Sequence, residues 1–407
     1  TQTNGLYISY ESTGLSTDGK DVMEVIVARD KAVVDNYLAL LKRAQTEPEA
    51  VAADVRSGRL SAYQVPVYIT NIHPNECPAV DQQIEFLKAV ATQETIPYLN
   101  GDNETCTYNV KDVLNDVFFI IRPTENPYAL EHYQRGNVEG FDLNRDSTYQ
   151  TQIESQVATA DLVKWKPVTL MELHGFIYYA RTQLQIEPCT PPHEPNLEYD
   201  LLVKNFALGS EAFGTAALGT MSATREEHPD TLYWSYYMPL RDDYDPSTMH
   251  WSAWDDLCTN YGPSYAMLNC GSLGYTIETP YNNEASTDLF EYGVYGLIDY
   301  VMEHKDDIYH NQLEFFRRGI ENEDHRDSME KWYVDVNNKQ LQSDTWRVPY
   351  EENDNYFPEY YVIPVDAASQ RDPADAYAMG RFLLRNGVRV SSLDTDTAVG
   401  GVTYRAG

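Results

Sequence analysis

Four short runs of largely apolar residues recur along the chain, and each of them leads into a polar loop. The runs span residues 65–69, 117–121, 168–173 and 274–277. Their length suits buried strands and is too short for ordinary helices. Stretches between them place apolar residues at three-and-four spacing, which is typical of helices. Strands that alternate with helices in this way predict an α/β fold, with a mixed, mostly parallel central sheet and helices on both faces.

Three stretches carry the helical pattern clearly enough to be placed. One runs from Asp30 to about Val55, a second has Asp81 as its N-cap, and a third runs from Asp288 to about Arg318 as one long helix. The third helix is expected to close a first domain of residues 1–318. The polar loops that follow the strands lie at their carboxyl ends, where the ligands of such sheets gather.

The remaining residues, 319–407, begin with a polar stretch rich in Asn, Asp and Glu. The expected elements are hairpin strands at 331–336 and 345–348, a strand at 360–365, a helix at 374–385 and a strand at 388–390. This order predicts a small C-terminal α+β domain, whose role the sequence leaves open.

Acidic residues dominate the charge of the chain, with 63 Asp and Glu against 30 Lys and Arg, a formal net charge of −33. Such a surface repels a phosphate backbone, which excludes nucleic acid as a partner. No apolar run approaches the roughly 18 residues of a membrane helix, so no membrane span is expected. The chain begins with Thr1, as after removal of a leader, and we expect a secreted or cell-envelope protein. Five cysteines allow disulfides, but their pairing stays open.

Two of the polar loops contain residue types that bind transition metals. His73 and Glu76 follow the first apolar run at HxxE spacing, and His174 ends the third run. The HxxE spacing alone is weak, but its place after a strand, in a loop with Pro74, lets these side chains converge. Two imidazoles and one carboxylate are three protein ligands for Zn²⁺ and leave a fourth position open, as in catalytic sites.

Further motifs accompany these residues in a fixed order along the chain. Asn126-Pro127 and the run RGNVEGFDLNRD at 135–146 resemble an NPDG…RxNxxGxDLNR block. Residues 173–175 (LHG) match a third-ligand strand, and residues 276–280 (TIETP) match a strand that carries a catalytic glutamate. In these blocks the sequence resembles the zinc metallocarboxypeptidases, the carboxypeptidase A-like family. The resemblance covers roughly residues 1–318.

The resemblance implies a role for each matching position. His73, Glu76 and His174 would bind one zinc ion, and Glu278 would be the general base that takes a proton from the attacking water. Arg135 would stand beside the scissile carbonyl and stabilise the developing oxyanion.

The substrate's terminal carboxylate would be held by Asn144 and Arg145, since a planar guanidinium suits a carboxylate. A tyrosine upstream of the glutamate also belongs to the family pattern. Tyr261 is the position we expect, with Tyr265 as the alternative. Asp142 is expected to hold its loop or to orient a ligand histidine from outside the metal site.

Several positions depart from the family pattern. Tyr128 and Ala129 follow Asn-Pro where Asp-Gly is usual, Gly175 follows the third ligand where the best-known members have Ser, and Asn75 stands where some relatives have Arg. None of these changes removes a catalytic group. They leave open the shape of the pocket that selects the substrate.

The sequence therefore predicts a zinc-dependent carboxypeptidase that hydrolyses the C-terminal bond of peptides with a free terminal carboxylate. One alternative is a zinc amide hydrolase that acts on cell-wall peptide stems or N-acyl amino acids. Another is a non-catalytic binding module with the same fold. Side-chain specificity and oligomeric state stay open.

Overall fold

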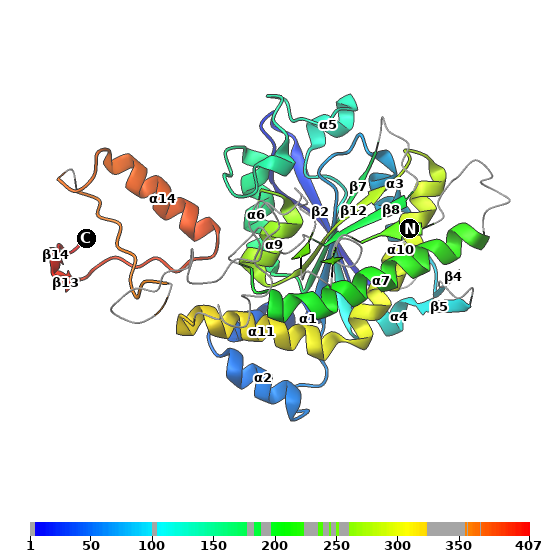
Figure 1. Ribbon diagram of the computed structural model, residues 1–407, viewed down its shortest axis with the longest axis horizontal. Coiled ribbons are helices and arrows are strands. Elements are labelled where there is room, and N and C mark those ends of the chain that lie inside the picture. Colours follow the sequence, from blue (N-terminus) through cyan, green and yellow to red (C-terminus); the bar gives the residue numbers. More distant parts are fainter. Residues whose placement is uncertain are drawn as a thin grey trace.

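A mixed sheet of eight strands, in the order β1-β2-β6-β3-β7-β12-β8-β9, forms the centre of the described part of the chain (Figure 1). The computed structural model describes residues 5–99, 104–176, 183–188, 197–223, 235–238, 244–245, 250–251, 260–323, 355, 357–366 and 368–407. The strands are β1 (Tyr7–Leu15), β2 (Asp21–Ala28), β3 (Val65–Thr70), β6 (Val117–Arg122), β7 (Thr169–Gly175), β8 (Gln183–Pro188), β9 (Ser235–Tyr237) and β12 (Leu273–Thr279).

The four runs predicted as strands are β3, β6, β7 and β12, which lie side by side and parallel to one another. Strands β1 and β2 pair antiparallel at one end of the sheet, and β8 pairs antiparallel with β12 towards the other. The α/β fold with a mixed, mostly parallel central sheet is thus confirmed. The carboxyl ends of β3, β7 and β12 meet at one edge, which is the edge that carries the site.

Helices cover both faces of this sheet, as predicted. The main helices are α1 (Lys31–Ala44), α2 (Pro48–Arg56), α3 (Cys77–Thr92), α6 (Ile153–Trp165), α7 (Tyr199–Ala223), α9 (Gly262–Cys270), α10 (Glu284–Glu303) and α11 (Lys305–Glu321). Adjacent residues of β6 show the two layers: Phe118 packs edge-on against Tyr37 of α1 and Trp165 of α6, whereas Phe119 packs against Phe86 of α3. Successive side chains of a strand point to opposite faces, so each phenylalanine belongs to a different layer.

Three helix predictions need correction. The stretch from Asp30 to Val55 is two helices, because Pro48 starts a new one and its ring cannot continue the first. The helix assigned an N-cap at Asp81 begins earlier, at Cys77, with a proline in its first turn. The long helix at 288–318 is α10 followed by α11, broken at His304, whose φ of −108° and ψ of 16° are not helical.

The N-terminal hairpin β1–β2 and the small antiparallel pair β4 (Thr95–Leu99) and β5 (Thr105–Asn109) were not predicted. Shorter elements are α4 (Val110–Val113), α5 (Pro127–His132), the 3-10 turn η1 (Leu143–Arg145), β10 (Tyr244–Asp245) and β11 (His250–Trp251). No helix in the described ranges has both the length and the apolar character needed to cross a bilayer.

In the C-terminal part, the helix expected at 374–385 is confirmed as α14 (Pro373–Arg385). The hairpin expected at 331–336 and 345–348 lies outside the described residues. The strands expected at 360–365 and 388–390 are wrong, since neither range forms a strand. Strands form instead at β13 (Thr397–Val399) and β14 (Val402–Tyr404), which pair with each other. Figure 1 shows α14 reaching away from the sheet, with one end beside α6.

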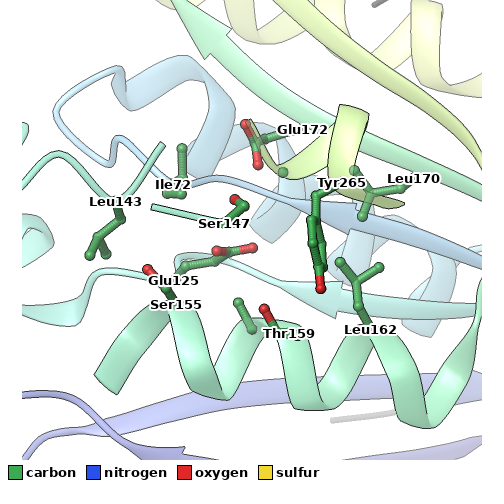
Figure 2. A pocket seen from close by; sticks show the side chains of 12 residues that line it. Ile72, Glu125, Leu143, Ser147, Ser155, Thr159, Leu162, Leu170, Glu172 and Tyr265 are labelled. Carbon is green, nitrogen blue, oxygen red and sulfur yellow. The ribbon is translucent and has the colours of Figure 1, made fainter. Parts of the chain in front are cut away.

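A small cavity of about 10 Å³ lies in the interior between β7 and helices α6 and α9 (Figure 2). The carboxylates of Glu125 and Glu172 both line it. Burial and the charge of Glu172 raise the pKa of Glu125 to about 7. The cavity has room for about one water molecule, and is therefore too small to be a substrate pocket.

A second group of buried charges lies between β2, β6 and α6. Arg122 Nη2 and the hydroxyl of Tyr68 each donate to Asp161 at 2.8 Å, and Trp165 Nε1 donates to both oxygens of Glu24 at 3.2 Å. Glu24 has no exposed surface. Burial, followed by the neighbouring Asp161, raises the pKa of Glu24 from 4.5 to about 9. The carboxyl of Glu24 is therefore protonated at neutral pH.

We predict that Glu24→Gln flattens the pH dependence of stability. Because the folded pKa lies above the unfolded one, the stabilising contribution is complete below pH 4.5 and is lost as the pH rises through about 9. The wild type should therefore lose up to about 1.4 kcal/mol of unfolding free energy per pH unit relative to the variant. Urea unfolding at pH 6 and pH 8 measures this difference. Glu11→Gln is the control, since Glu11 also contacts Lys164 but is exposed; parallel pH profiles for Glu24→Gln and wild type would contradict the prediction.

Candidate metal centre and active site

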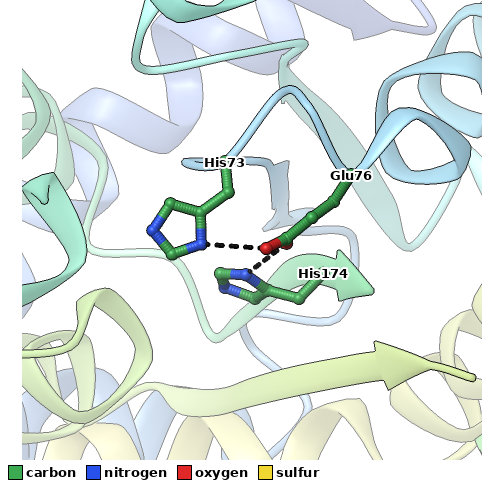
Figure 3. A group of neighbouring side chains, drawn as sticks. All are labelled: His73, Glu76 and His174. Carbon is green, nitrogen blue, oxygen red and sulfur yellow. Dashed lines mark hydrogen bonds and ion pairs between the residues drawn. The ribbon is translucent and has the colours of Figure 1, made fainter. Parts of the chain in front are cut away.

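The three predicted metal ligands meet at the carboxyl ends of the parallel strands (Figure 3). His73 lies in the loop after β3, Glu76 is the residue before the first turn of α3, and His174 is near the end of β7. One donor atom from each side chain lies within 4.8 Å of the other two, and all three residues are buried. Glu76 lies between the imidazoles, with Oε1 3.3 Å from His73 Nδ1 and Oε2 2.9 Å from His174 Nδ1.

In each histidine, a carboxylate contacts Nε2, the ring nitrogen that points away from Glu76. Nε2 of His73 is 2.8 Å from Asp142 Oδ1, and Nε2 of His174 is 2.6 Å from Glu172 Oε2. These contacts orient both rings so that their Nδ1 atoms face Glu76. A carboxylate on the far nitrogen is the usual support of a metal-binding histidine, because it fixes the ring and makes it a stronger donor.

The donor set fits a zinc ion. Two imidazole nitrogens and one carboxylate are typical ligands of catalytic Zn²⁺. Nδ1 of His73 is buried and faces Glu76 Oε1 at 3.3 Å, so a donor nitrogen and a carboxylate oxygen point into the same space, as metal ligands do. Burial alone would raise the pKa of Glu76, but the charges of His73 and then His174 outweigh it and lower that pKa to about 2. The carboxylate is therefore ionised across the physiological range, as a ligand must be.

Gly175, a departure from the family pattern, has a structural reason. Its backbone N–H donates to Glu76 Oε2 at 3.1 Å. A Cβ at this position would lie 2.8 Å from Thr279 Oγ1 of the neighbouring strand, closer than real Cβ contacts. A larger residue here would therefore require the Thr279 hydroxyl to move, whereas glycine leaves it in place.

Glu278, the predicted general base, lies beside His174. The two residues are register partners on the parallel strands β12 and β7. Partners in a parallel pair project from the same face of the sheet, so Glu278 lies on the face that carries the metal ligand. Glu278 is half-buried, whereas His174 is buried.

Arg135, in the loop between α5 and η1, contacts two of these side chains. Its Nε donates to Asp142 Oδ2 at 2.8 Å, and its Nη1 donates to Glu76 Oε1 at 3.4 Å. Its side chain is 46% exposed. The guanidinium therefore lies at the mouth of the buried triad, partly in contact with solvent.

Asn144, Arg145 and Tyr261 form a second cluster, which is linked to the triad through Asp142, whose Oδ1 accepts from the backbone N–H of Asn144 at 3.0 Å. The guanidinium carbon of Arg145 lies 4.3 Å from the centre of the Tyr261 ring, and Asn144 Oδ1 accepts from the backbone N–H of Gly262 at 3.3 Å. Tyr265, the alternative tyrosine, is buried, and its hydroxyl accepts from Gln150 at 3.1 Å. The structure thus brings Tyr261 to Arg145 and turns Tyr265 into the interior.

Sequence reasoning missed Glu172. The signal was available, because Glu172 stands two residues before His174 in an otherwise apolar strand, and residues at this spacing share a face of a sheet. A carboxylate in a buried strand requires a partner. Asp142 was expected to support a ligand histidine, and its contact with His73 has that form.

The fold is similar to that of several solved structures, whose sequences share little identity with this chain. No protein-family model matches the sequence, and no curated protein does. Similar structures include a metallo-carboxypeptidase from Burkholderia cenocepacia, with 15% identity, a TM-score of 0.43 and coverage of 72% of this chain and 64% of that one. Carboxypeptidase A from Helicoverpa armigera has 13% identity, a TM-score of 0.43 and coverage of 74% and 68%. A succinylglutamate desuccinylase/aspartoacylase from Rhodobacter sphaeroides has 11% identity, a TM-score of 0.40 and coverage of 74% and 66%.

Metallocarboxypeptidases, the family that the sequence motifs resemble, are thus among the structural neighbours. The chain spans less than two thirds of the length of the first of them, at 64%. At these identities and TM-scores the likeness carries no conclusion about activity. The chemistry of this chain follows from its own residues.

We predict that Glu172→Gln and Asp142→Asn each weaken zinc binding by about 10- to 100-fold, since both remove the charge that supports a ligand histidine while keeping its shape. Competition for zinc against a chromophoric chelator measures the affinity. Glu139→Gln, an exposed change in the same loop as Asp142, is the control and should bind zinc like the wild type. Unchanged zinc affinity in both supporting variants would contradict the assigned contacts.

Proposed function

We propose that this protein is a zinc-dependent carboxypeptidase, which hydrolyses the amide bond next to a free terminal carboxylate. The observation that carries the proposal is the register of β7 and β12, which places the half-buried Glu278 beside His174 of the His73–Glu76–His174 triad. A metal-ligand triad with an additional carboxylate on the same face is the arrangement that amide hydrolysis by activated water requires.

The triad would hold one Zn²⁺. Zinc bound there supplies a Lewis acid, which polarises a carbonyl and makes water a nucleophile near neutral pH. Glu278 would accept the proton that the attacking water loses and then deliver it to the leaving amine. A carboxylate in this position contributes typically about 10²- to 10⁴-fold to the rate.

Arg135 would stabilise the negative charge that develops on the carbonyl oxygen. Its contacts with Asp142 and Glu76 hold the guanidinium near the triad, while its exposed part remains available to a substrate. Fixed donors of this kind act at low cost in reorganisation, since they are already oriented before the reaction.

Arg145 and Asn144 would bind the terminal carboxylate of the substrate. The cation–π contact of Arg145 with Tyr261 holds the guanidinium in place, and its N–H groups can then form paired hydrogen bonds with a carboxylate. A peptide C-terminus and an N-acyl amino acid both provide such a carboxylate. The substrate panel below separates these two classes.

We predict that Glu278→Gln retains zinc but loses about 10²- to 10⁴-fold in kcat, because glutamine keeps the shape of glutamate and cannot accept the proton. Metal analysis together with hydrolysis of a chromogenic peptide measures both quantities. The matched control is Glu284→Gln, an exposed glutamate six residues further along, which should behave like the wild type. Turnover within a few-fold of wild type in Glu278→Gln would eliminate the proposal.

We predict that Arg145→Ala raises KM for free-acid peptides by about 10- to 100-fold, the range expected for loss of hydrogen bonds to a charged group. The same peptides with an amidated C-terminus should be hydrolysed slowly by the wild type and no more slowly by the variant. Including N-acyl amino acids in the panel tests the other substrate class. Equal hydrolysis of free-acid and amidated peptides by the wild type would contradict a carboxypeptidase.

A further inference from the structure

Gln150 has an unusual backbone and an unusual environment. Its φ of 53° lies in the left-handed region, which residues other than glycine rarely adopt. The residue is only 2% exposed. A buried glutamine in a strained backbone persists only where the surrounding contacts hold it there.

The side chain of Gln150 makes those contacts with the C-terminal part of the chain. Gln150 Nε2 donates to Asn386 Oδ1 at 2.9 Å, and Gln150 Oε1 accepts from Arg385 Nε at 2.6 Å. Arg385 is the last residue of α14, and Asn386 is its C-cap. The two contacts span 236 and 235 residues of sequence, so they join α14 to the first domain.

The same amide group also contacts the region around the proposed active site. Gln150 Nε2 also lies 3.1 Å from the hydroxyl of Tyr265 in α9 and 3.2 Å from the backbone oxygen of Ser147, so its two hydrogens are shared among three acceptors. Ser147 N–H in turn donates to the backbone oxygen of Asn260 at 3.2 Å. Gln150 therefore ties α14 to two segments at once, residues 143–150 and the start of α9.

These two segments carry the residues that would grip the substrate carboxylate. Asn144 and Arg145 lie on the first segment, and Tyr261 lies on the second, with the stacking of Arg145 on Tyr261 between them. The Asn144 contact with the Gly262 N–H joins them again. Both segments therefore contribute contacts at the position of the Arg145 guanidinium.

Helix α14 contributes little to the core of the protein. Ala376 is the one buried residue within the helix, while Tyr377, Met379 and Leu384 are exposed. Its polar end at Arg385 and Asn386, in contrast, meets the buried Gln150. The contact between α14 and Gln150 therefore consists mainly of hydrogen bonds and buries little apolar surface.

We infer that α14 acts as a brace for the substrate grip: Arg385 and Asn386 hold Gln150, and Gln150 sets the position of the segment that carries Asn144 and Arg145. The inference rests on the function proposed above for those two residues. Arg385, Asn386 and Gln150 are positioning residues, which act through Arg145 and do not touch the substrate. This assigns the C-terminal helix a part in substrate recognition.

The experiment compares kcat and KM for a peptide with a free C-terminus and for its amidated form. Asn386→Ala and Arg385→Ala should each raise KM for the free acid by about tenfold, as expected for a displaced charge-assisted contact, and leave kcat within about twofold of wild type. Asn386→Asp keeps the oxygen that accepts from Gln150 and should restore most of the affinity. Arg381→Ala is the matched control, because it removes the same charge from an exposed position of the same helix.

The possible outcomes separate this inference from the proposed function. If the wild type prefers the free acid and both variants keep that preference and its KM, the brace is refuted and the carboxypeptidase stands. If the variants lose kcat equally on free and amidated peptides, α14 only stabilises the fold, and the brace is again refuted. If the wild type itself shows no preference for the free acid, the proposed function fails and the inference fails with it.

Discussion

The carboxylate of Glu76, placed between two buried imidazoles, is the interaction on which the arrangement of the site depends. A buried charge of this kind is costly unless it is paired and hydrogen-bonded. Here the two Nδ1 atoms, the backbone N–H of Gly175 and the guanidinium of Arg135 surround it. The parallel strands make this possible, because their ends bring residues from distant parts of the chain to one edge of the sheet.

The carboxylates of Asp142 and Glu172, which each contact a histidine of the triad, lie in different environments. Asp142 shares its oxygens between His73 and the partly exposed Arg135, so its charge is compensated near the solvent. Glu172 is buried with His174 and faces the small cavity that Glu125 also lines. The raised pKa of Glu125 follows from this arrangement, since burial and the negative charge of Glu172 both disfavour its ionised form. The Asp142 side of the site thus reaches partly exposed side chains, whereas the Glu172 side is enclosed by protein.

The proposed substrate grip depends on a second set of long-range contacts. Arg145 is exposed, and a long side chain at the surface has many conformations. Stacking on Tyr261 restricts it, and the segments that carry both residues meet at Asn144 and Gly262. The hydrogen bonds of Gln150 extend this arrangement to the end of α14, which reaches away from the central sheet.

The sequence by itself determined the elements whose signal is local. Apolar runs marked β3, β6, β7 and β12, because strand length is a property of short segments. The residue types of His73, Glu76 and His174, each at or just after the end of such a run, marked them as candidate metal ligands. The strands expected at 360–365 and 388–390 do not form, since strand formation depends on packing against other strands, which a short segment of sequence does not contain. The breaks at Pro48 and His304 changed helix lengths without moving the site.

Only the tertiary structure decided how distant segments meet. The register that sets Glu278 beside His174, the choice of Tyr261 over Tyr265 as the neighbour of Arg145, and the contact of Gln150 with Asn386 all join residues far apart in the chain. Strand order, side-chain direction and helix docking arise from packing over the whole fold, and no local window of sequence contains them.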